Sequence, residues 1–141
     1  MTKIVSRVLI RKPPETVFDY LVDPRNELKW NPAVERMEMI GDGPIGVGTK
    51  FNAKWKSSTP IVTECVKFDR PHSWAYHNDG PVTVDVEISL TENLEGTMLV
   101  STFDAQPNGL FRLIFPVFLQ IMKREEKANM GFLKQAVEAL N

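Results

Sequence analysis

Cysteine and histidine are scarce in this sequence, which contains one cysteine, Cys65, and two histidines, His72 and His77. A single cysteine cannot form a disulfide within the chain, so a disulfide-stapled fold is excluded. These few residues do not supply the usual ligand set of a zinc site, and no serine–histidine–aspartate triad can be assembled around them. We therefore expect no metal and no cofactor, and we interpret Cys65 as a small core residue.

An excess of charge of one sign is also missing, because 17 lysines and arginines stand against 18 aspartates and glutamates. Proteins that bind nucleic acid usually carry a basic face, so nucleic acid is not an expected partner. The most apolar stretch, residues 110–122, is shorter than the roughly 20 residues of a membrane-spanning helix. The N-terminus lacks the apolar segment of a secretory signal. We therefore expect a cytoplasmic protein with no stable membrane insertion.

What the sequence does contain is a strong alternation of apolar and polar residues. Its 141 residues, of which 43% are hydrophobic, predict one globular domain over residues 1–141. The alternation is clearest at residues 82–90, where valines, an isoleucine and a leucine occupy every second position. The same reasoning predicts strands at 3–11, 34–40, 49–57, 61–68, 72–77, 82–90 and 97–104.

Helix signals occur at three places in the chain. Pro14 and Glu15 suit the first turn of a helix, and Asp23 can cap a second short helix that ends before Pro32. A long helical segment follows residue 109 and runs to residue 140, with its apolar residues at helical spacing. Pro116 must either kink this helix or mark its true start, because an interior proline removes a hydrogen bond.

The order of these elements predicts the fold class. We expect an α+β helix-grip fold, with a curved antiparallel sheet of about seven strands, two short helices and a long C-terminal helix. The long helix is the only element large enough to cover the apolar face of the sheet. A helix lying across a strongly bent sheet cannot fill the concave side, so the remaining space is the expected pocket.

Several short motifs, in this order and spacing, resemble one known superfamily. They are Pro13–Phe18, Trp30–Pro32, the glycine loop at 43–49, Phe68–Pro71, Gly96-Thr97 and the segment 131–138. Together they resemble the START/Bet v 1-like (SRPBCC) superfamily in its polyketide cyclase/dehydrase-type branch, over nearly the whole chain. The resemblance implies a helix-grip fold with an internal pocket. It implies no particular reaction, because every matched motif is a turn or a packing position.

Binding of a small hydrophobic ligand is the predicted function, the ligand being a lipid, an aromatic or a polyketide-like molecule. Aromatic side chains are the usual lining of such pockets. We expect the ligand to contact the inward-facing side chains of the strands and of the apolar stretch after residue 109. These are Phe51, Ala53, Trp55, Trp74, Tyr76, Val84, Val86, Leu99, Ser101, Phe103, Leu110, Phe111, Ile114 and Phe118.

Two alternatives remain open. The first is a cyclase or dehydratase that uses the same pocket, with Glu64 or Tyr76 moving protons. Glu64 shares strand parity with Val62, Val66 and Phe68 and is therefore expected to face inward, where burial would raise its pKa. The second is an interaction module, in which residues 110–122 contact another protein or a second copy in a homodimer.

Overall fold

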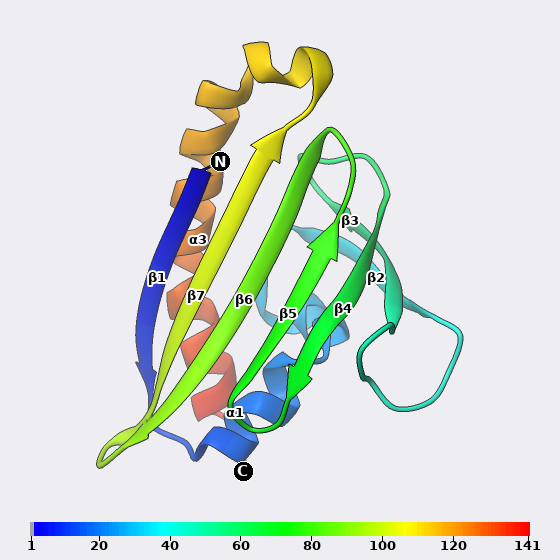
Figure 1. Ribbon diagram of the computed structural model, residues 1–141. Helices are drawn as coiled ribbons and strands as arrows, with labels where there is room; N and C mark the ends of the chain where they lie inside the picture. The colour runs from blue at the N-terminus through cyan, green and yellow to red at the C-terminus, as the bar shows by residue number, and fades with distance from the viewer. Residues whose placement is uncertain (1) are drawn as a thin grey trace.

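A seven-stranded antiparallel sheet forms the framework of the molecule, which a computed structural model describes for residues 2–141 (Figure 1). The strand order is β1-β7-β6-β5-β4-β3-β2, so the first strand of the chain pairs with the last. The strands are β1 (Thr2–Ile10), β2 (Val34–Ile40), β3 (Lys50–Trp55), β4 (Ile61–Asp69), β5 (Ser73–Asn78), β6 (Val82–Asn93) and β7 (Gly96–Pro107).

The helices confirm the predicted pattern and decide the role of Pro116. α1 (Pro14–Leu21) follows β1, and the second short helix consists of η1 (Pro24–Asn26) and α2 (Glu27–Trp30). The Asp23 side chain caps η1 by accepting a hydrogen bond from the backbone N–H of Arg25 at 3.0 Å. A 3-10 turn, η2 (Gly109–Leu113), leads into α3 (Phe115–Glu138). Pro116 lies in the first turn of α3, so it marks the start of the long helix.

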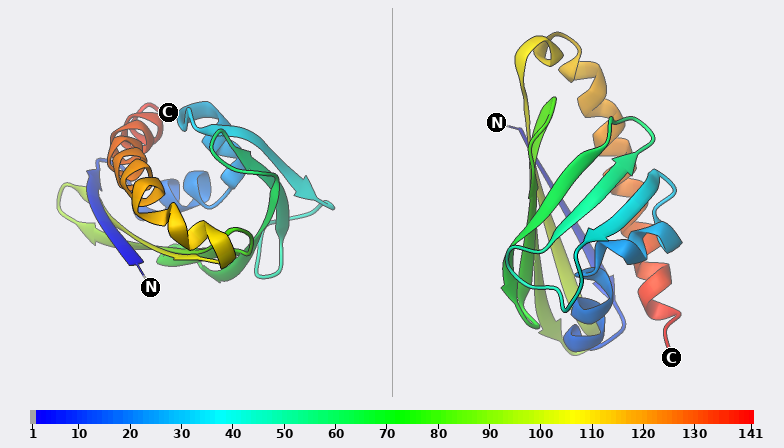
Figure 2. Two further views of the ribbon diagram at one scale, coloured as in Figure 1. Left: turned by 90° about the horizontal axis from the view of Figure 1, so that it is seen from above. Right: turned by 90° about the vertical axis from the view of Figure 1, so that its right-hand side faces the viewer.

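The sheet is curled, and the helices lie on its concave side (Figure 2). α3 runs along that side next to β1, while α1 and α2 lie across it near the C-terminal end of α3. This is the predicted α+β helix-grip fold. The helices cover only part of the concave face of β5, β6 and β7. The space that remains between the helices and these strands contains the site.

The main core fills one end of this space. Phe18 of α1 is completely buried and packs edge-on against Phe68 and Trp74, with ring centroids 5.2 and 5.1 Å apart. Leu99 of β7 and Val137 of α3 are also fully buried in this cluster. The core therefore anchors α1 and the C-terminal half of α3 to the sheet and leaves the other end of the concave face less filled.

One irregularity changes which side chains of β4 face inward. The register of β4 with β5 shifts between Cys65 and Lys67, which is a β-bulge centred on Val66. Before the bulge, Thr63 and Cys65 are buried, whereas Val62 and Val66 are 45% and 46% exposed. After it, the alternation is reversed, so that Phe68 packs against the core.

Candidate functional site

The candidate site is a cavity of about 350 Å³ between the concave face of the sheet, α2 and α3. This volume is within the range of small-molecule sites in proteins, roughly 300–1,000 Å³. Most of the side chains around it are apolar. Ten of the fourteen predicted pocket residues line it: Trp55, Trp74, Tyr76, Val84, Val86, Leu99, Ser101, Phe103, Phe111 and Phe118.

The structure places the other four predicted residues outside the cavity. Phe51 and Ala53 are buried, but they pack beside it in a separate cluster with Met37. Leu110 and Ile114 are 85% and 56% exposed. Phe111 and Phe118 turn inward from the same apolar stretch, whereas Ile114 lies at the junction between η2 and α3, where no continuous helix places it on the same face as Phe118.

Glu64 does not face the cavity, so the expectation that it points inward is wrong. Its parity with Val62 and Val66 was correct, but those two valines are on the outer face, and only the bulge brings Phe68 to the inner face. Glu64 lies beside Lys50 and His77 in a shallow outer depression. It therefore has no access to a ligand inside the cavity.

Tyr76 lines the cavity, but its hydroxyl group is engaged. It donates a hydrogen bond to the backbone carbonyl oxygen of Val22 at 2.8 Å. Burial raises the pKa of Tyr76 well above its usual range, so the phenol stays neutral. The Tyr76 ring forms part of the cavity wall, and its hydroxyl group links β5 to the end of α1. The hydroxyl proton is used in this hydrogen bond.

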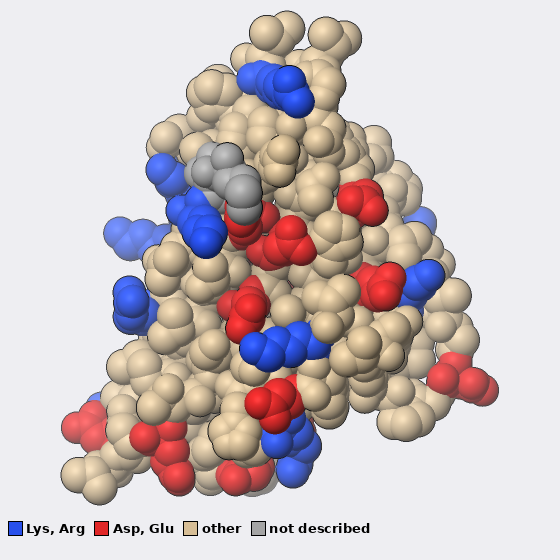
Figure 3. Space-filling model, viewed as in Figure 1, with Lys and Arg blue, Asp and Glu red and all other residues tan. Residues whose placement is uncertain are grey.

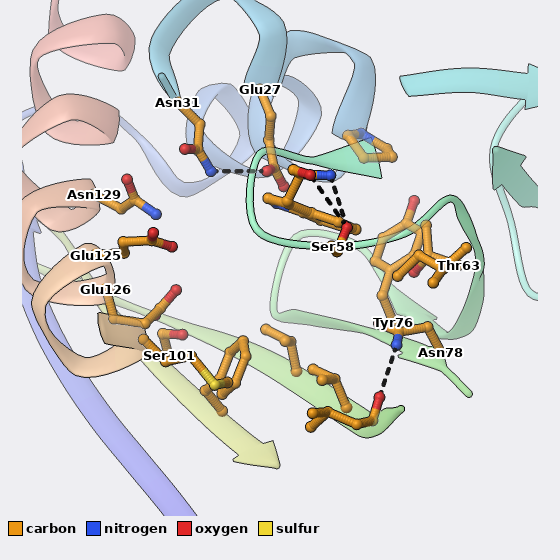
Figure 4. Close-up of a pocket in the computed structure, with 18 of the residues that line it drawn as sticks. Glu27, Asn31, Ser58, Thr63, Tyr76, Asn78, Ser101, Glu125, Glu126 and Asn129 are labelled. Carbon is orange, nitrogen blue, oxygen red and sulfur yellow. Dashed lines mark hydrogen bonds between the residues drawn. The ribbon is translucent and has the colours of Figure 1, made fainter. Parts of the chain in front are cut away.

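Three carboxyl groups that the sequence analysis missed line the cavity: Glu27 on α2, and Glu125 and Glu126 on α3 (Figure 4). Burial raises the pKa of Glu27 and of Glu126 to about 7. The negative charge of Glu126 also raises the pKa of Glu27, which shows that the two groups influence one another. Both groups therefore change charge near neutral pH.

Amide and hydroxyl groups accompany these carboxyl groups. Asn31 donates a hydrogen bond from Nδ2 to Glu27 Oε2 at 3.2 Å and accepts one from the backbone N–H of Ala33. Asn129 on α3 is only 9% exposed, and its side chain makes no hydrogen bond within residues 2–141. Ser101 on β7 is 2% exposed and lies across the cavity from α2 (Figure 4). The cavity thus has its carboxyl groups in one region, and uncharged polar side chains also line it at residues 57–59, Thr63 and Asn78.

The helical period of α3 was the signal that could have identified Glu126. Met122, Met130 and Leu133 form the inward stripe of this helix, and Glu126 lies one turn from each of the first two. A carboxyl group within an apolar stripe indicates a buried acid. Only the apolar residues of this helix were considered from the sequence, so Glu126 was not recognised as part of the inward stripe.

The start of α3 and the preceding turn have one side in the cavity and one side in solvent. Phe111 and Phe118 pack edge-on at 5.2 Å between ring centroids and line the cavity. Leu113 and Val117 are 80% and 69% exposed. Within residues 2–141, no helix has both the length and the apolar character needed to cross a membrane. The apolar stretch therefore contributes to the cavity wall on one side and presents uncovered apolar surface on the other.

The outer face of the sheet carries a mixture of charges. Figure 3 shows acidic and basic side chains interspersed over this face. Some form ion pairs, such as Lys67 with Glu87 at 3.0 Å. Among the described residues, no three or more acidic, histidine or cysteine side chains are grouped so that they could hold a metal ion.

A curled antiparallel sheet that grips a long helix around a mostly apolar cavity defines the helix-grip class of proteins. The chain belongs to the family described as polyketide cyclase/dehydrase and lipid transport, whose family model matches residues 1–138. This confirms the predicted membership of the START/Bet v 1-like superfamily. Comparison with curated protein sequences finds no match.

Solved structures of the same fold are similar to this chain over its whole length. TTHA0849 from Thermus thermophilus has a TM-score of 0.77 at 18% identity, with 98% of both chains covered. The di-domain ARO/CYC BexL from the BE-7585A biosynthetic pathway has a TM-score of 0.77 at 16% identity, covering 99% of this chain and 51% of that one. Ara h 8.0201 has a TM-score of 0.72 at 16% identity, with 99% of both chains covered. Identities this low show the fold alone.

Proposed function

We propose that the protein binds a small hydrophobic molecule, such as a lipid, an aromatic or a polyketide-like compound, in its internal cavity. The observation that carries this proposal is the cavity of about 350 Å³ whose wall consists mainly of aromatic and aliphatic side chains. Apolar burial of a ligand there stabilises the complex by about 25 cal/mol per Å² before the entropic cost of binding. We further propose that residues 1–141 act as one domain in the cytoplasm.

A bulky side chain at Ser101 is expected to block the cavity. Ser101 is almost fully buried, and its side chain lies on the cavity wall in the middle of β7. In a Ser101→Phe variant the ring would occupy space that the ligand needs. We expect native mass spectrometry and organic extraction to find a hydrophobic molecule with the gently purified wild-type protein. We expect none with this variant.

The matched control is Val100→Phe, on the opposite face of the same strand. It adds a ring of the same size outside the cavity and should leave the copurified molecule in place. Thermal unfolding of both variants checks that the fold is intact. An empty wild-type protein that also fails to bind a hydrophobic dye would contradict the proposal.

A second candidate function is catalysis of a cyclase or dehydratase type in the same cavity. It is favoured by Glu27 and Glu126, whose pKa values of about 7 suit proton transfer at neutral pH. Glu27 and Glu126 replace Glu64 as the candidate acid and base, because Glu64 lies on the outer face. In this function one carboxylate would accept a proton from the substrate while a protonated carboxyl group donates one.

Conversion of the extracted molecule by the protein tests this second function. We expect Glu126→Gln to reduce any turnover by about a hundredfold, because general acid–base catalysis contributes about 10²–10⁴ in rate. Glu64→Gln should leave turnover unchanged. Equal turnover in all three proteins would exclude Glu126 from the chemistry. The expected homodimer and a protein contact through residues 110–122 stay predictions.

A further inference from the structure

The charged side chains of the cavity are gathered where α2 faces α3, whereas uncharged polar side chains also line it at residues 57–59, Thr63 and Asn78. Glu125, Glu126 and Asn129 extend from α3 toward the cavity, and Glu27 and Asn31 lie on the α2 side (Figure 4). The opposite wall, formed by β6 and β7, is apolar except for Ser101. A ligand in this cavity therefore meets all of the carboxyl groups at one end, hydrocarbon along β6 and β7, and only uncharged polar groups elsewhere.

No positive charge balances these carboxyl groups. None of the residues that line the cavity is a lysine, arginine or histidine. The basic side chains next to them on α3, Lys123, Arg124 and Lys127, are exposed on its outer side. Glu125 and Glu126 accept no hydrogen bond from any residue in the range 2–141, and Glu27 accepts one from Asn31 only. Half-buried carboxylates that no basic side chain neutralises are stabilised by a nearby positive charge, so this region favours a cationic group.

Asn129 is a second and independent sign that a polar group belongs here. More than nine-tenths of the residue is buried, and its amide makes no hydrogen bond within the described part of the chain. The amide atoms themselves remain accessible from the cavity, unlike the fully buried and unpartnered Trp30 Nε1. Figure 4 shows this amide directed from α3 toward the cavity, next to Glu125. Buried amides are normally hydrogen-bonded. Its carbonyl oxygen and its NH₂ group are both available to a ligand.

We infer that the ligand of this cavity is an amphipathic amine, whose protonated nitrogen lies between the carboxyl groups of Glu27 and Glu126 and whose apolar part contacts the sheet. An ammonium group has three N–H donors, which the carboxylates and the Asn129 carbonyl oxygen can accept. The tryptophan and tyrosine rings of the wall also favour a cation. A ligand with a carboxylate head would be repelled. This inference rests on the proposed binding function and names its ligand class.

The charges that face Glu27 and Glu126 give the amine preference a definite pH dependence. The titratable groups nearest to them are Glu125 on α3, whose pKa is also raised by burial, and Tyr76 on β5, which stays neutral. Asp23 and Arg25 on η1 neutralise one another at 2.8 Å. An alkylamine stays protonated up to about pH 10. The preference for the amine should therefore increase as the pH rises through about 7, where the carboxyl groups ionise.

Octylamine, octanol and octanoate form a matched set of probes, because they share one chain and differ in the charge of the head group. Isothermal titration at about pH 8 should show octylamine binding at least about tenfold more tightly than octanol, with octanoate weakest. At about pH 5.5 the preference for octylamine over octanol should largely disappear, because the carboxyl groups are then protonated.

Four variants complete the experiment. Glu27→Gln and Glu126→Gln, alone and combined, should reduce the amine preference and leave octanol binding unchanged. Glu64→Gln, on the outer face, should behave like the wild type. Equal binding of octylamine and octanol at about pH 8, or a preference for octanoate, would overturn the inference while leaving the binding function intact. If none of the three probes binds, the binding function itself fails.

Discussion

Raising the pH from about 5 to about 8 is expected to lower the free energy of unfolding by about 4 kcal/mol. The cause is the pair of carboxyl groups, Glu27 and Glu126, whose pKa rises from 4.5 in the unfolded chain to about 7 in the folded protein. Each such displacement corresponds to about 3 kcal/mol. We expect less than twice that value, because water in the cavity screens both charges.

The direction follows from which state binds more protons. Between about pH 4.5 and 7 the folded protein holds protons on these carboxyl groups that the unfolded chain has lost, so stability falls as the pH rises. The raised pKa of His77, caused by Asp85 and Asp79, acts in the same direction as its proton leaves. Asp19, Glu35 and Glu138 have lowered pKa values, and they reduce stability only in more acidic solution.

Urea unfolding at several pH values measures this effect. The wild-type protein should have its highest unfolding midpoint near pH 5 and a steadily lower one up to about pH 8. The Glu27→Gln/Glu126→Gln variant should lose most of this slope, whereas Glu64→Gln should keep it. A stability that is constant or increasing between pH 5 and 8 would show that these carboxyl groups are well solvated in the folded state.

Replacement of Phe18 by alanine is expected to lower the free energy of unfolding by about 3–5 kcal/mol. Phe18 is completely buried, and its ring packs edge-on against both Phe68 and Trp74. Its removal leaves a hole where α1 joins the sheet, and the surrounding side chains can close that hole only in part. Because Trp74 also lines the cavity, hydrophobic dye binding should change in the same variant.

Phe132→Ala provides the control, since it makes the same chemical change at a side chain that is 40% exposed on α3. It should cost about 1 kcal/mol or less. Chemical denaturation of both variants gives the comparison. A Phe18→Ala variant as stable as Phe132→Ala would mean that the α1 core does not hold the sheet and helices together.

The sequence was sufficient to predict the elements and their order, because their signals are local. Alternation predicted all seven strands, and the structure confirms β2 at the predicted residues, Val34–Ile40. Proline and aspartate marked the short helices through capping rules that act within a few residues. The curled sheet and covering helix then follow from the need to bury one apolar face.

The polar part of the site was not predictable to the same extent, because it depends on contacts between distant segments. Glu27 and Glu126 are separated by most of the chain, and neither lies in a recognisable motif. They come together only when α3 lies across the sheet and α2 approaches it. Glu64 was misplaced for a different reason, since strict alternation cannot reveal a bulge.

The bulge at Val66 also has a consequence for how this cavity can diverge in evolution. It is a single extra residue in β4, located between the cavity-facing Thr63 and the core-facing Phe68. Loss of one residue at this point, with Phe68 held in the core, would exchange the two faces of the first half of β4. Val62 and Glu64 would then face inward in place of Thr63 and Cys65. One deletion in a strand would thus bring a carboxyl group to the inner face of the sheet, at the buried position that Cys65 now occupies beside the cavity.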